Sequence, residues 1–589
     1  MKENRSLSPA RREGQGEGAA SRATHSAPIP ALMKRSTPFL LAVASGLSMA
    51  LALPLVIPWL SLRELDPHGR LEVVAWVALL PLLWALDGAP RARRAFSLGF
   101  LGGLAYFYVA IYWVSHAMTA FGGLPTWLAF VALSLLVGYM AVHWGGALAV
   151  AWWVRRRLGW PLWAQLPFVW AAFELLRNYS LSGFPWGNLG YTQARTLPVA
   201  QLAAVTGVYG IAALVVLVNA LVHDGVRAVT EGRLPAIHRG TTRRHGLALL
   251  AVLGLAFGLG EARLSAVRRE IAAAPALRVG IVQANVDQSV KNTARDHVEE
   301  ILGRLVPRTV EADRAGAELV AWPEAAYPMY LPPGLRSLDV PGVGLPPLSR
   351  THLLLGATTL ERGAPDGEGQ PTRRITNSVF LLTPGLDVVG RHAKEHLVPF
   401  GEYVPLARWL SFLHQVVPTF APVSPGPEEG ALVMARPAGA VRIAPLICYD
   451  AIFPEIARRF ARTGADLLVN PTNDAWYGYS SGPYQFLAMV RLRAIETGRT
   501  VLRPAWAGVS ALLLPTGEVA PGAIEIGPVD PDLAPAPEEP SRLLLADAPL
   551  LRGTTLYTRF GDLFGWGCSL FTVAALALAW RAARRPATQ

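Results

Sequence analysis

A cysteine at the end of an apolar run is the residue in this sequence with the clearest chemical potential. Residues 441–447 are mostly β-branched or apolar, which predicts a buried strand that ends at Cys448. A helical pattern starts near Ala451, so the thiol would lie at a helix N-terminus, where free backbone N–H groups favour a thiolate and an oxyanion. A free cysteine is also commonly a small core residue, so this stretch alone leaves both interpretations open.

Two further segments carry the groups that a nucleophilic thiol needs. Glu324 follows the predicted strand 318–322 in AWPEAAYP, where it is either a cap for the next segment or a general base. Lys394 and Glu402 lie in RHAKEHLVPFGEYVP, a predicted loop whose charges are either solvated or part of a site. Glu324 could accept the thiol proton, and Lys394, with a backbone N–H near Cys448, could stabilise a tetrahedral intermediate.

The remaining histidines and cysteines indicate no second type of chemistry. His392 and His396 flank Lys394, and we expect structural or supporting roles for both, because no cysteine–histidine dyad is indicated. The second cysteine, Cys568, lies in the last apolar run, so we expect no disulfide with Cys448. The sequence has no cluster of cysteine and histidine with metal-ligand spacing, so we expect neither a metal ion nor a cofactor.

The candidate site residues fall in a segment of alternating strands and helices at residues 263–560. Strands are predicted at 277–283, 318–322, 353–358, 378–382, 387–390, 441–447, 466–470, 500–502 and 509–514. Helices are predicted at 293–315, 453–462 and 484–496. This alternation predicts a layered α/β domain, and roughly 270 residues suffice for a complete core.

The rest of the chain is too apolar for a wholly soluble protein. Of its 589 residues, 52% are hydrophobic, and the mean hydropathy is +0.31. Eight apolar runs predict eight transmembrane helices, at 36–62, 73–86, two within 95–154, 158–173, 196–222, 246–260 and 563–580. Three runs, 73–86, 158–173 and 246–260, are short enough to be interfacial or re-entrant instead. Residues 36–262 would thus hold seven spans, and 561–589 the eighth with a basic tail.

The net charge of +12 could suggest a nucleic-acid partner, but the distribution of arginine indicates a membrane. The strong basic clusters are Lys34–Arg35, Arg91–Arg94, Arg155–Arg157, Arg227–Arg244 and Arg581–Arg585. If all eight runs span, every cluster falls on one side, which the positive-inside rule makes the cytoplasm. The α/β domain is then expected outside.

Two segments of the membrane part have particular compositions. Residues 1–35 are polar and basic, which predicts a disordered tail. Residues 178–195 are rich in aromatic residues, Gly and Pro, which predicts either a lipid-facing wall below the α/β domain or an interfacial aromatic belt with Trp186 and Tyr191. Glu174 and Arg177 are one helical turn apart, a spacing that permits an ion pair.

The three chemical segments, in their order, resemble the Glu–Lys–Cys set of the nitrilase superfamily, whose domain is a carbon-nitrogen hydrolase. The resemblance rests on Glu324 in WPE, Lys394 before HLVPFGEYVP and Cys448 in ICYD. With the apolar runs, the chain from about residue 37 resembles the apolipoprotein N-acyltransferase family of bacteria. That likeness includes GFPW (183–186), Gln283, NDAWYG (473–478) and GPYQ (482–485).

The resemblance implies a fold, a reaction and a location. The fold would be a helical membrane bundle and a four-layer α-β-β-α sandwich in the periplasm, anchored in the inner membrane. Glu324 would be the base, Lys394 the oxyanion stabiliser and Cys448 the nucleophile, with supporting roles for Glu402 and Tyr449. Cys448 would attack the sn-1 ester of a phospholipid, with phosphatidylethanolamine as the expected donor. The α-amine of the diacylglyceryl-cysteine of an apolipoprotein would then accept the acyl group from the thioester.

Three segments depart from the family pattern, and two other functions fit parts of the sequence. Asp450 stands where the family commonly has Glu, Lys291–Asn292 where it often has Lys-Trp, and residues 504–508 replace an Asn-Asn-Gly segment. These departures concern substrate fit more than the chemistry. A membrane-tethered amidase would share the site but resolve the thioester with water. A transporter or lipid-binding receptor with an inert domain would not need the intact Glu, Lys and Cys.

Overall fold

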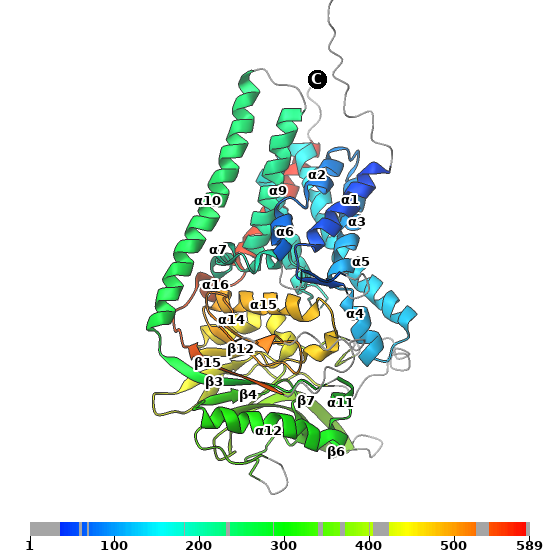
Figure 1. Cartoon of the computed structure of the whole chain (residues 1–589). Coiled ribbons are helices and arrows are strands. Elements are labelled where there is room, and N and C mark those ends of the chain that lie inside the picture. Colours follow the sequence, from blue (N-terminus) through cyan, green and yellow to red (C-terminus); the bar gives the residue numbers. More distant parts are fainter. Residues whose placement is uncertain are drawn as a thin grey trace, which may run out of the picture.

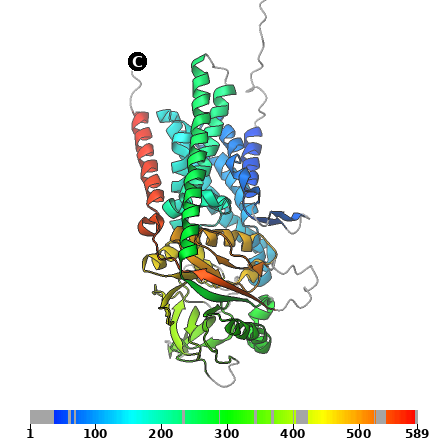
Figure 2. The ribbon, with the colours of Figure 1, turned by 60° about the vertical axis from the view of Figure 1, so that its left-hand side comes forward.

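The computed structural model shows a helical bundle standing on an α/β domain (Figure 1). The residues it describes are 36–57, 62–66, 70–181, 183–230, 236–286, 288–339, 345–365, 371–399, 401–403, 423–522, 524–525 and 541–584. The predicted tail at 1–35 lies outside these ranges. In both orientations the bundle helices extend from the same side of the α/β domain (Figures 1 and 2).

The bundle contains helices of very different lengths. The helices are α1 (Thr37–Ala50), α2 (Leu80–Asp87), α3 (Ala92–Ala110), α4 (Trp113–His116), α5 (Thr126–Leu158), α6 (Leu162–Tyr179), α7 (Leu197–Ala200), α8 (Ala203–Thr206), α9 (Val208–Thr230), α10 (Ala236–Ala273) and α17 (Leu563–Arg584). Short irregular helices are η3 (Arg70–Trp76), η4 (Ala117–Phe121) and η5 (Leu189–Gln193). A small hairpin, β1 (Leu55–Ile57) and β2 (Leu62–Asp66), lies between α1 and η3.

The prediction of eight spans is supported only in part. Within the described ranges, four helices (α5, α9, α10 and α17) are long and apolar enough to cross a membrane. The pair α3–α4, bent by 52°, makes a fifth candidate. The first apolar run, predicted as one continuous span, is instead a 14-residue helix followed by strand β1. Pro54 precedes that strand, and a proline in this position cannot continue helical hydrogen bonding.

Glycine allows the bundle helices to approach closely. A Cβ on Gly46 of α1 would lie 2.1 Å from the carbonyl oxygen of Gly102 in α3. A Cβ on Gly99 of α3 would lie 2.6 Å from the carbonyl oxygen of Trp144 in α5. Small residues at such crossings bring backbones together, which gives extensive van der Waals contact where hydrophobic burial from water contributes little. Substitution of Gly46 or Gly99 by alanine would therefore force α1, α3 and α5 apart.

Two mixed sheets form the α/β domain. The first has the order β15-β3-β4-β6-β7-β8, with β5 paired to β6, and the second has the order β14-β13-β12-β11-β10-β9. The strands of the first sheet are β3 (Ala276–Gln283), β4 (Leu319–Ala321), β5 (Tyr327–Leu331), β6 (His352–Pro365), β7 (Pro371–Leu382), β8 (Val388–Ala393) and β15 (Arg542–Pro549). Those of the second are β9 (Leu432–Met434), β10 (Val441–Pro445), β11 (Leu467–Val469), β12 (Thr500–Arg503), β13 (Val509–Leu513) and β14 (Ile524–Glu525). In each sheet the three central strands that carry the core, β3-β4-β6 and β10-β11-β12, are parallel.

The sheets lie face to face between two helical layers, as the α-β-β-α prediction requires. Ile281 of β3 and Ile443 of β10 belong to the same buried cluster between the sheets. Val282, the next residue of β3, faces the opposite side and joins the cluster that contains Leu305 of α12 (Val298–Arg314). Ala444 of β10 faces α14 (Pro454–Arg462), α15 (Gly482–Thr497) and the membrane helices. The alternation of neighbouring side chains along each strand therefore produces four layers.

Several elements differ from the prediction. The predicted helix 293–315 begins as a short 3₁₀ turn, η6 (Ala294–His297), before α12. The strands predicted at 353–358 and 378–382 extend into a long β6–β7 hairpin, whereas β5, β9, β14 and β15 were not predicted. The β15 strand pairs with β3 along its whole length. The first and last strands of the domain are therefore neighbours: the chain enters from α10 into β3 and leaves from β15 into α16 (Leu556–Phe560) and α17.

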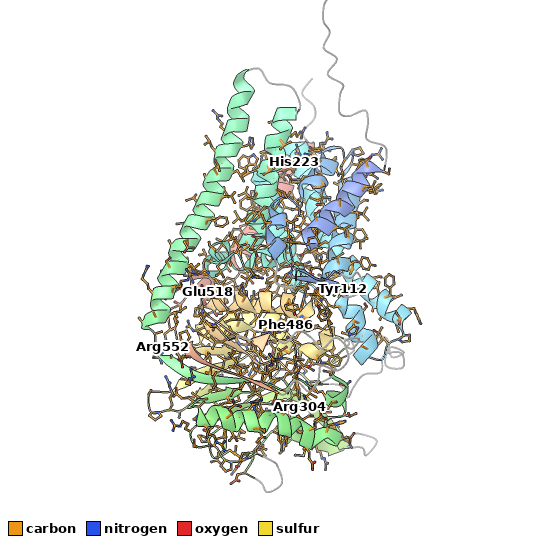
Figure 3. All side chains as sticks on the ribbon, in the orientation of Figure 1. Tyr112, His223, Arg304, Phe486, Glu518 and Arg552 are labelled. Carbon is orange, nitrogen blue, oxygen red and sulfur yellow. The ribbon has the colours of Figure 1, made fainter. Side chains whose placement is uncertain are left out.

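Direct hydrogen bonds join the bundle to the α/β domain. Trp186 donates from Nε1 to Oε1 of Gln485 in α15 at 2.7 Å, and Gln485 Nε2 donates to the carbonyl of Pro54 at 3.1 Å. Ser481 Oγ donates to the carbonyl of Val56 at 3.1 Å. Phe486, labelled in Figure 3, lies at this junction. The layer of α14 and α15 is therefore the face of the domain that contacts the membrane part (Figure 1).

Candidate active site

The three predicted site residues follow three different strands. Glu324 follows β4, Lys394 follows β8 and Cys448 follows β10. Their exposed fractions are 6%, 1% and 7% respectively, so all three are buried. Two come from the first sheet and one from the second, and the structure brings them together between the sheet ends. The carboxylate of Glu324 accepts a hydrogen bond from Lys394 at 3.1 Å, and Cys448 is among the groups that lower the pKa of Glu324.

Lys394 is an ammonium group held between two carboxylates. Its Nζ donates to Glu324 Oε1 at 3.1 Å and to Glu402 Oε1 at 2.9 Å. Burial alone would lower the pKa of Lys394, but these two carboxylates raise it well above the usual value. Glu402 is held in turn, because its Oε2 accepts the backbone N–H of Val398 at 2.8 Å. Glu402, for which a supporting role was predicted, thus contacts Lys394 directly. The alternative that Lys394 is a solvated surface charge is wrong.

Glu324 is kept ionised by its neighbours. Burial alone would raise the pKa of this carboxyl, but the charges of Lys394 and Lys291 and the hydrogen bonds from Lys394 and Cys448 lower it below the usual value. Asn377 in β7 donates from Nδ2 to Glu324 Oε1 at 2.6 Å. A carboxylate with these partners is ionised throughout the neutral range, as a general base must be.

Cys448 occupies a strained turn rather than the start of an α-helix. Its φ of +47° lies in the left-handed region, which non-glycine residues seldom adopt, and its N–H donates to the carbonyl of Pro471 at 2.8 Å. The turn η7 (Cys448–Ile452) is a 3₁₀ helix, and α14 begins only at Pro454. The thiol therefore lies at the start of a short 3₁₀ helix and not of the predicted α-helix, and the N–H of Cys448 is not free because it donates to Pro471.

The thiol is protonated before reaction. Burial, followed by the charge of Glu324, raises the pKa of Cys448 to about 12, although Lys394, Thr472 and Asn473 act in the opposite direction. Thr472 places its hydroxyl 3.4 Å from the Cys448 sulfur. A thiol in this environment loses its proton only as a nearby base accepts it.

Asp450, one of the departures from the family pattern, ties the cysteine turn to the lysine loop. Its carboxylate accepts the backbone N–H of His396 at 2.8 Å and that of Ile447 at 3.1 Å. Burial raises its pKa to about 7, with Lys394 acting in the opposite direction. The ring of His396 packs on Phe453 with 4.3 Å between centroids, which agrees with the structural role predicted for this histidine.

Three contacts at the site were not predicted from the sequence. Asn377 bonds to the Glu324 carboxylate, Thr472 contacts the Cys448 sulfur, and Lys291 Nζ donates to the main-chain carbonyl of Glu324 at 3.1 Å. A polar residue inside an apolar strand was the available signal for Asn377 in RITNSVFLL. The segment that holds Lys291 was noted only as a departure from the family pattern.

Aromatic side chains from the membrane part lie against the loop behind Cys448. Tyr477 contacts Trp113 of α4 at 4.7 Å and Trp186 at 6.2 Å between ring centroids. Tyr449, predicted to support catalysis, packs edge-on against Phe453 at 5.2 Å. Trp186 and Tyr191 are 2% and 3% exposed, so they pack inside the protein and do not form the predicted interfacial aromatic belt. The site therefore lies next to the membrane helices.

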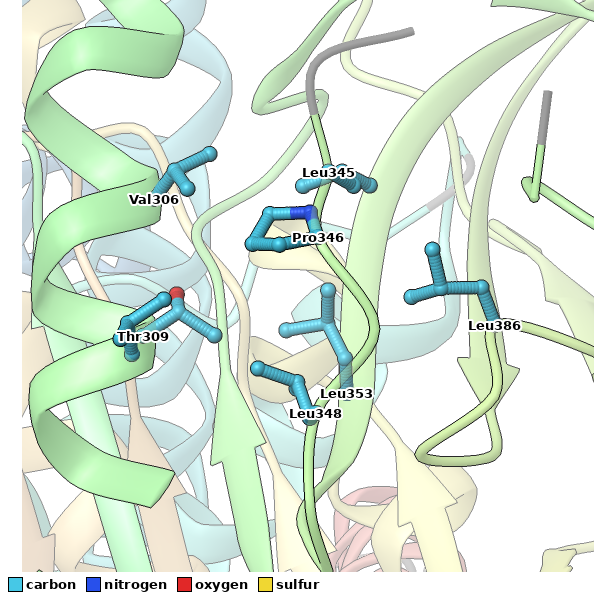
Figure 4. Close-up of a pocket in the computed structure, with 8 residues that line it drawn as sticks. Val306, Thr309, Leu345, Pro346, Leu348, Leu353 and Leu386 are labelled. Carbon is cyan, nitrogen blue, oxygen red and sulfur yellow. The ribbon is translucent and has the colours of Figure 1, made fainter. Parts of the chain in front are cut away.

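A separate apolar cavity lies on the far side of the first sheet, between α12 and strand β6 (Figure 4). Its volume is about 10 Å³, which is room for a single water molecule. The Thr309 hydroxyl in its lining already donates to Leu305 and accepts from Trp322. This cavity is a packing gap and not a substrate site. Among the residues that the structure describes, no group of three His, Cys, Asp or Glu side chains could share a metal ion.

Comparisons with known proteins cover both parts of the chain. Residues 45–221 match the apolipoprotein N-acyltransferase N-terminal domain, and residues 278–526 match the carbon-nitrogen hydrolase domain. An apolipoprotein N-acyltransferase of Geobacter metallireducens is 35% identical over 547 residues, which are 92% of this chain and 95% of that protein. One from Allorhizobium ampelinum is 32% identical over 507 residues, covering 82% and 87% of the two chains. The crystal structure of an amidase from Nesterenkonia sp. is similar at 20% identity and a TM-score of 0.30, covering 46% of this chain and 90% of the amidase.

Proposed function

This chain belongs to the apolipoprotein N-acyltransferase family, whose members N-acylate lipoproteins, and we propose that it does so through a thioester on Cys448. The observation that carries this proposal is the convergence of Glu324, Lys394 and Cys448 in one buried site. A nucleophile, an ionised base and a fixed ammonium are the groups required for acyl transfer through a covalent intermediate.

In the first step the Cys448 sulfur attacks the sn-1 ester carbonyl of a phospholipid. Glu324 accepts the thiol proton as the carbon–sulfur bond forms, and Lys394 stabilises the negative charge that develops on the carbonyl oxygen. The tetrahedral intermediate then breaks its bond to the glycerol oxygen, which takes the proton from Glu324. The products of this step are an acyl-enzyme thioester and a lysophospholipid.

In the second step the α-amine of the diacylglyceryl-cysteine attacks the thioester carbonyl. Glu324 accepts a proton from the attacking amine, and Lys394 again stabilises the oxyanion. The carbon–sulfur bond breaks, the proton passes from Glu324 to the Cys448 sulfur, and the acceptor leaves with a new amide bond. Burial of all three groups favours the amine over water at this step.

We also propose that all eight apolar segments lie in the cytoplasmic membrane, with the catalytic domain (263–560) in the periplasm. The shorter helices α1 and α2 support this because they pack on each other, and α1 also packs on α3. Arg155 and Arg227, which bond to Asp87 beside His223 at the end of the bundle away from the α/β domain (Figure 3), favour this orientation. The junction of Trp186 with Gln485 supports a site at membrane level, where phosphatidylethanolamine reaches it as acyl donor.

The orientation predicts opposite accessibility for two engineered cysteines. In a background of Cys448→Ala and Cys568→Ala, we introduce Arg362→Cys in the exposed part of β6 or Arg157→Cys in the exposed last turn of α5. A maleimide that cannot cross membranes should label residue 362 in spheroplasts and residue 157 only after lysis. Labelling of residue 157 in intact spheroplasts would contradict the orientation.

The reaction itself is tested with defined substrates. Purified enzyme, phosphatidylethanolamine and a diacylglyceryl-cysteine peptide should give an N-acylated peptide, detected by mass spectrometry. The same peptide with an acetylated α-amine is the matched control and should accept nothing, because its nitrogen has no free lone pair to attack the thioester. Release of free fatty acid without N-acylated peptide would instead identify a hydrolase.

A further inference from the structure

Trp506 connects the base and the nucleophile from a loop between β12 and β13. Its side chain is fully buried, and the indole Nε1 donates to the main-chain carbonyl of Glu324 at 2.6 Å. Its backbone N–H donates to the carbonyl of Thr472 at 3.3 Å, and its carbonyl accepts the N–H of Asn285 at 2.7 Å. These three hydrogen bonds of Trp506 therefore all connect it to chain segments at the site.

These segments belong to different sheets. Glu324 and Asn285 follow β4 and β3 of the first sheet, whereas Thr472 follows β11 of the second. The Thr472 hydroxyl is the group that lies 3.4 Å from the Cys448 sulfur. Trp506 is thus bonded at once to the residue that carries the base and to the residue beside the nucleophile. The separation of the two sheets at this point depends on that connection.

Lys291 acts on the same carbonyl as Trp506. Its Nζ donates to the Glu324 carbonyl at 3.1 Å and lies 4.9 Å from the centre of the Trp506 ring. The adjoining residue Ala325 has a φ of +47°, and a Cβ on Gly356 would come within 2.1 Å of the carbonyl of Pro323. The turn that carries Glu324 is therefore tightly packed and bonded from two sides.

The loop that presents Trp506 is itself anchored. At its start, Arg503 makes two hydrogen bonds of 2.8 Å to the carboxylate of Asp474, and both side chains are fully buried. At its end, Gly508 has a φ of +77°, and a Cβ there would meet the Cβ of Asp474 at 2.7 Å. Such a loop holds the indole in one place, which a positioning role requires.

We propose that Trp506, together with Lys291, is a positioning residue that fixes the Glu324 carboxylate relative to the Cys448 thiol. This inference rests on the proposed function, in which these two groups exchange a proton. A displacement of about 1 Å between reacting groups can slow a reaction ~100-fold. Loss of the indole donor therefore affects the chemical step and not the affinity for lipid.

Trp506→Phe tests this role because phenylalanine retains the ring and both backbone bonds but has no N–H for the Glu324 carbonyl. We expect thioester formation on Cys448, followed in a single turnover with phosphatidylethanolamine vesicles, to be ~10–100-fold slower, with the lipid concentration for half-maximal rate unchanged. The matched control is Trp152→Phe, which removes an indole bond to the Ala89 carbonyl in the bundle, 2.8 Å long, and should leave the rate unchanged.

Lys291→Met provides a second test, because it removes the ammonium from a partly exposed side chain while leaving the Trp506 indole in place. We expect a slower chemical step and a shift of the acidic limb of the rate profile to higher pH, since the charge of Lys291 helps to lower the pKa of Glu324. A purely structural residue would not move that limb. The two variants should be non-additive when combined, because both act on one carbonyl.

The outcomes separate this inference from the proposed function. If the wild-type enzyme forms the thioester, and both Trp506→Phe and Lys291→Met form it at the wild-type rate, the positioning role is overturned and the proposed function stands. If the wild-type enzyme forms no thioester, both are overturned. A Trp506→Phe protein that does not fold leaves the decision to Lys291→Met and its pH profile.

Discussion

Replacing Cys448 with alanine abolishes both thioester formation and N-acylation of the lipoprotein peptide. The alanine removes the sulfur that carries the acyl group in the proposed mechanism, and Glu324 and Lys394 supply no replacement for it. Removal of a catalytic nucleophile commonly lowers turnover by ~10⁶-fold. The measurement is the amount of N-acylated peptide formed by the purified variant in phosphatidylethanolamine vesicles, with complementation of a strain that lacks the acyltransferase as the cellular counterpart.

Cys568→Ala is the matched control for this variant. Cys568 is also buried, but it lies in α17 among the membrane helices, so its loss should leave the thioester and the transfer intact. Phospholipid binding by Cys448→Ala should remain, which distinguishes loss of the nucleophile from loss of the fold. Turnover by Cys448→Ala at a rate near that of the wild-type enzyme would exclude the covalent mechanism.

Lys394→Ala slows formation of the acyl-enzyme by ~10²–10³-fold, as expected for loss of one oxyanion donor. It also leaves the carboxylates of Glu324 and Glu402 without the ammonium between them, so the pKa of Glu324 rises and the acidic limb of the rate profile moves to higher pH. Lys394→Arg does not restore the rate, because the planar guanidinium is larger than the ammonium and the site is fully packed. Pre-steady-state measurement of the thioester gives these rates.

A control on the strand that leads to Lys394 isolates the role of this charge. Arg391 lies three residues before Lys394 in β8 and is half-buried, and Arg391→Ala should change the acylation rate little. Phospholipid affinity should be similar in all three variants, because Lys394 acts on the transition state. A Lys394→Ala enzyme with the wild-type rate would remove Lys394 from the catalytic set.

Much of the catalytic site could be predicted because its chemical residues follow recognisable strands. Glu324 and Cys448 each stand directly after an apolar run, and Lys394 stands in a loop whose prolines and glycine exclude a helix. The strand ends alone did not predict that the three meet, because β4 and β8 are not neighbours in the first sheet and β10 belongs to the second. The alternation of strands and helices predicted a layered α/β domain. The four layers were predicted only by the resemblance to the nitrilase superfamily.

Contacts between the sheets could not be predicted, because they depend on how the sheets are positioned and not on local sequence. The indole of Trp506 reaches Glu324, which is 182 positions earlier in the chain. Two departures from the family pattern, Lys291–Asn292 and residues 504–508, were assigned to substrate fit. In the structure, Lys291 packs on the Trp506 ring, and both side chains donate to the main-chain carbonyl of Glu324. The prediction of one continuous span over the first apolar run was wrong for a local reason. The run is apolar throughout, but its helix ends at Ala50, and Pro54 prevents helical hydrogen bonding from continuing into β1.

The most direct test of the mechanism is the mass of the wild-type enzyme after incubation with phosphatidylethanolamine in the absence of an acceptor. We predict that the peptide containing Cys448 gains the mass of one fatty acyl group, that hydroxylamine removes this group, and that addition of the diacylglyceryl-cysteine peptide transfers it to the peptide amine. An enzyme that N-acylates the peptide while Cys448 never carries an acyl group would contradict the thioester mechanism.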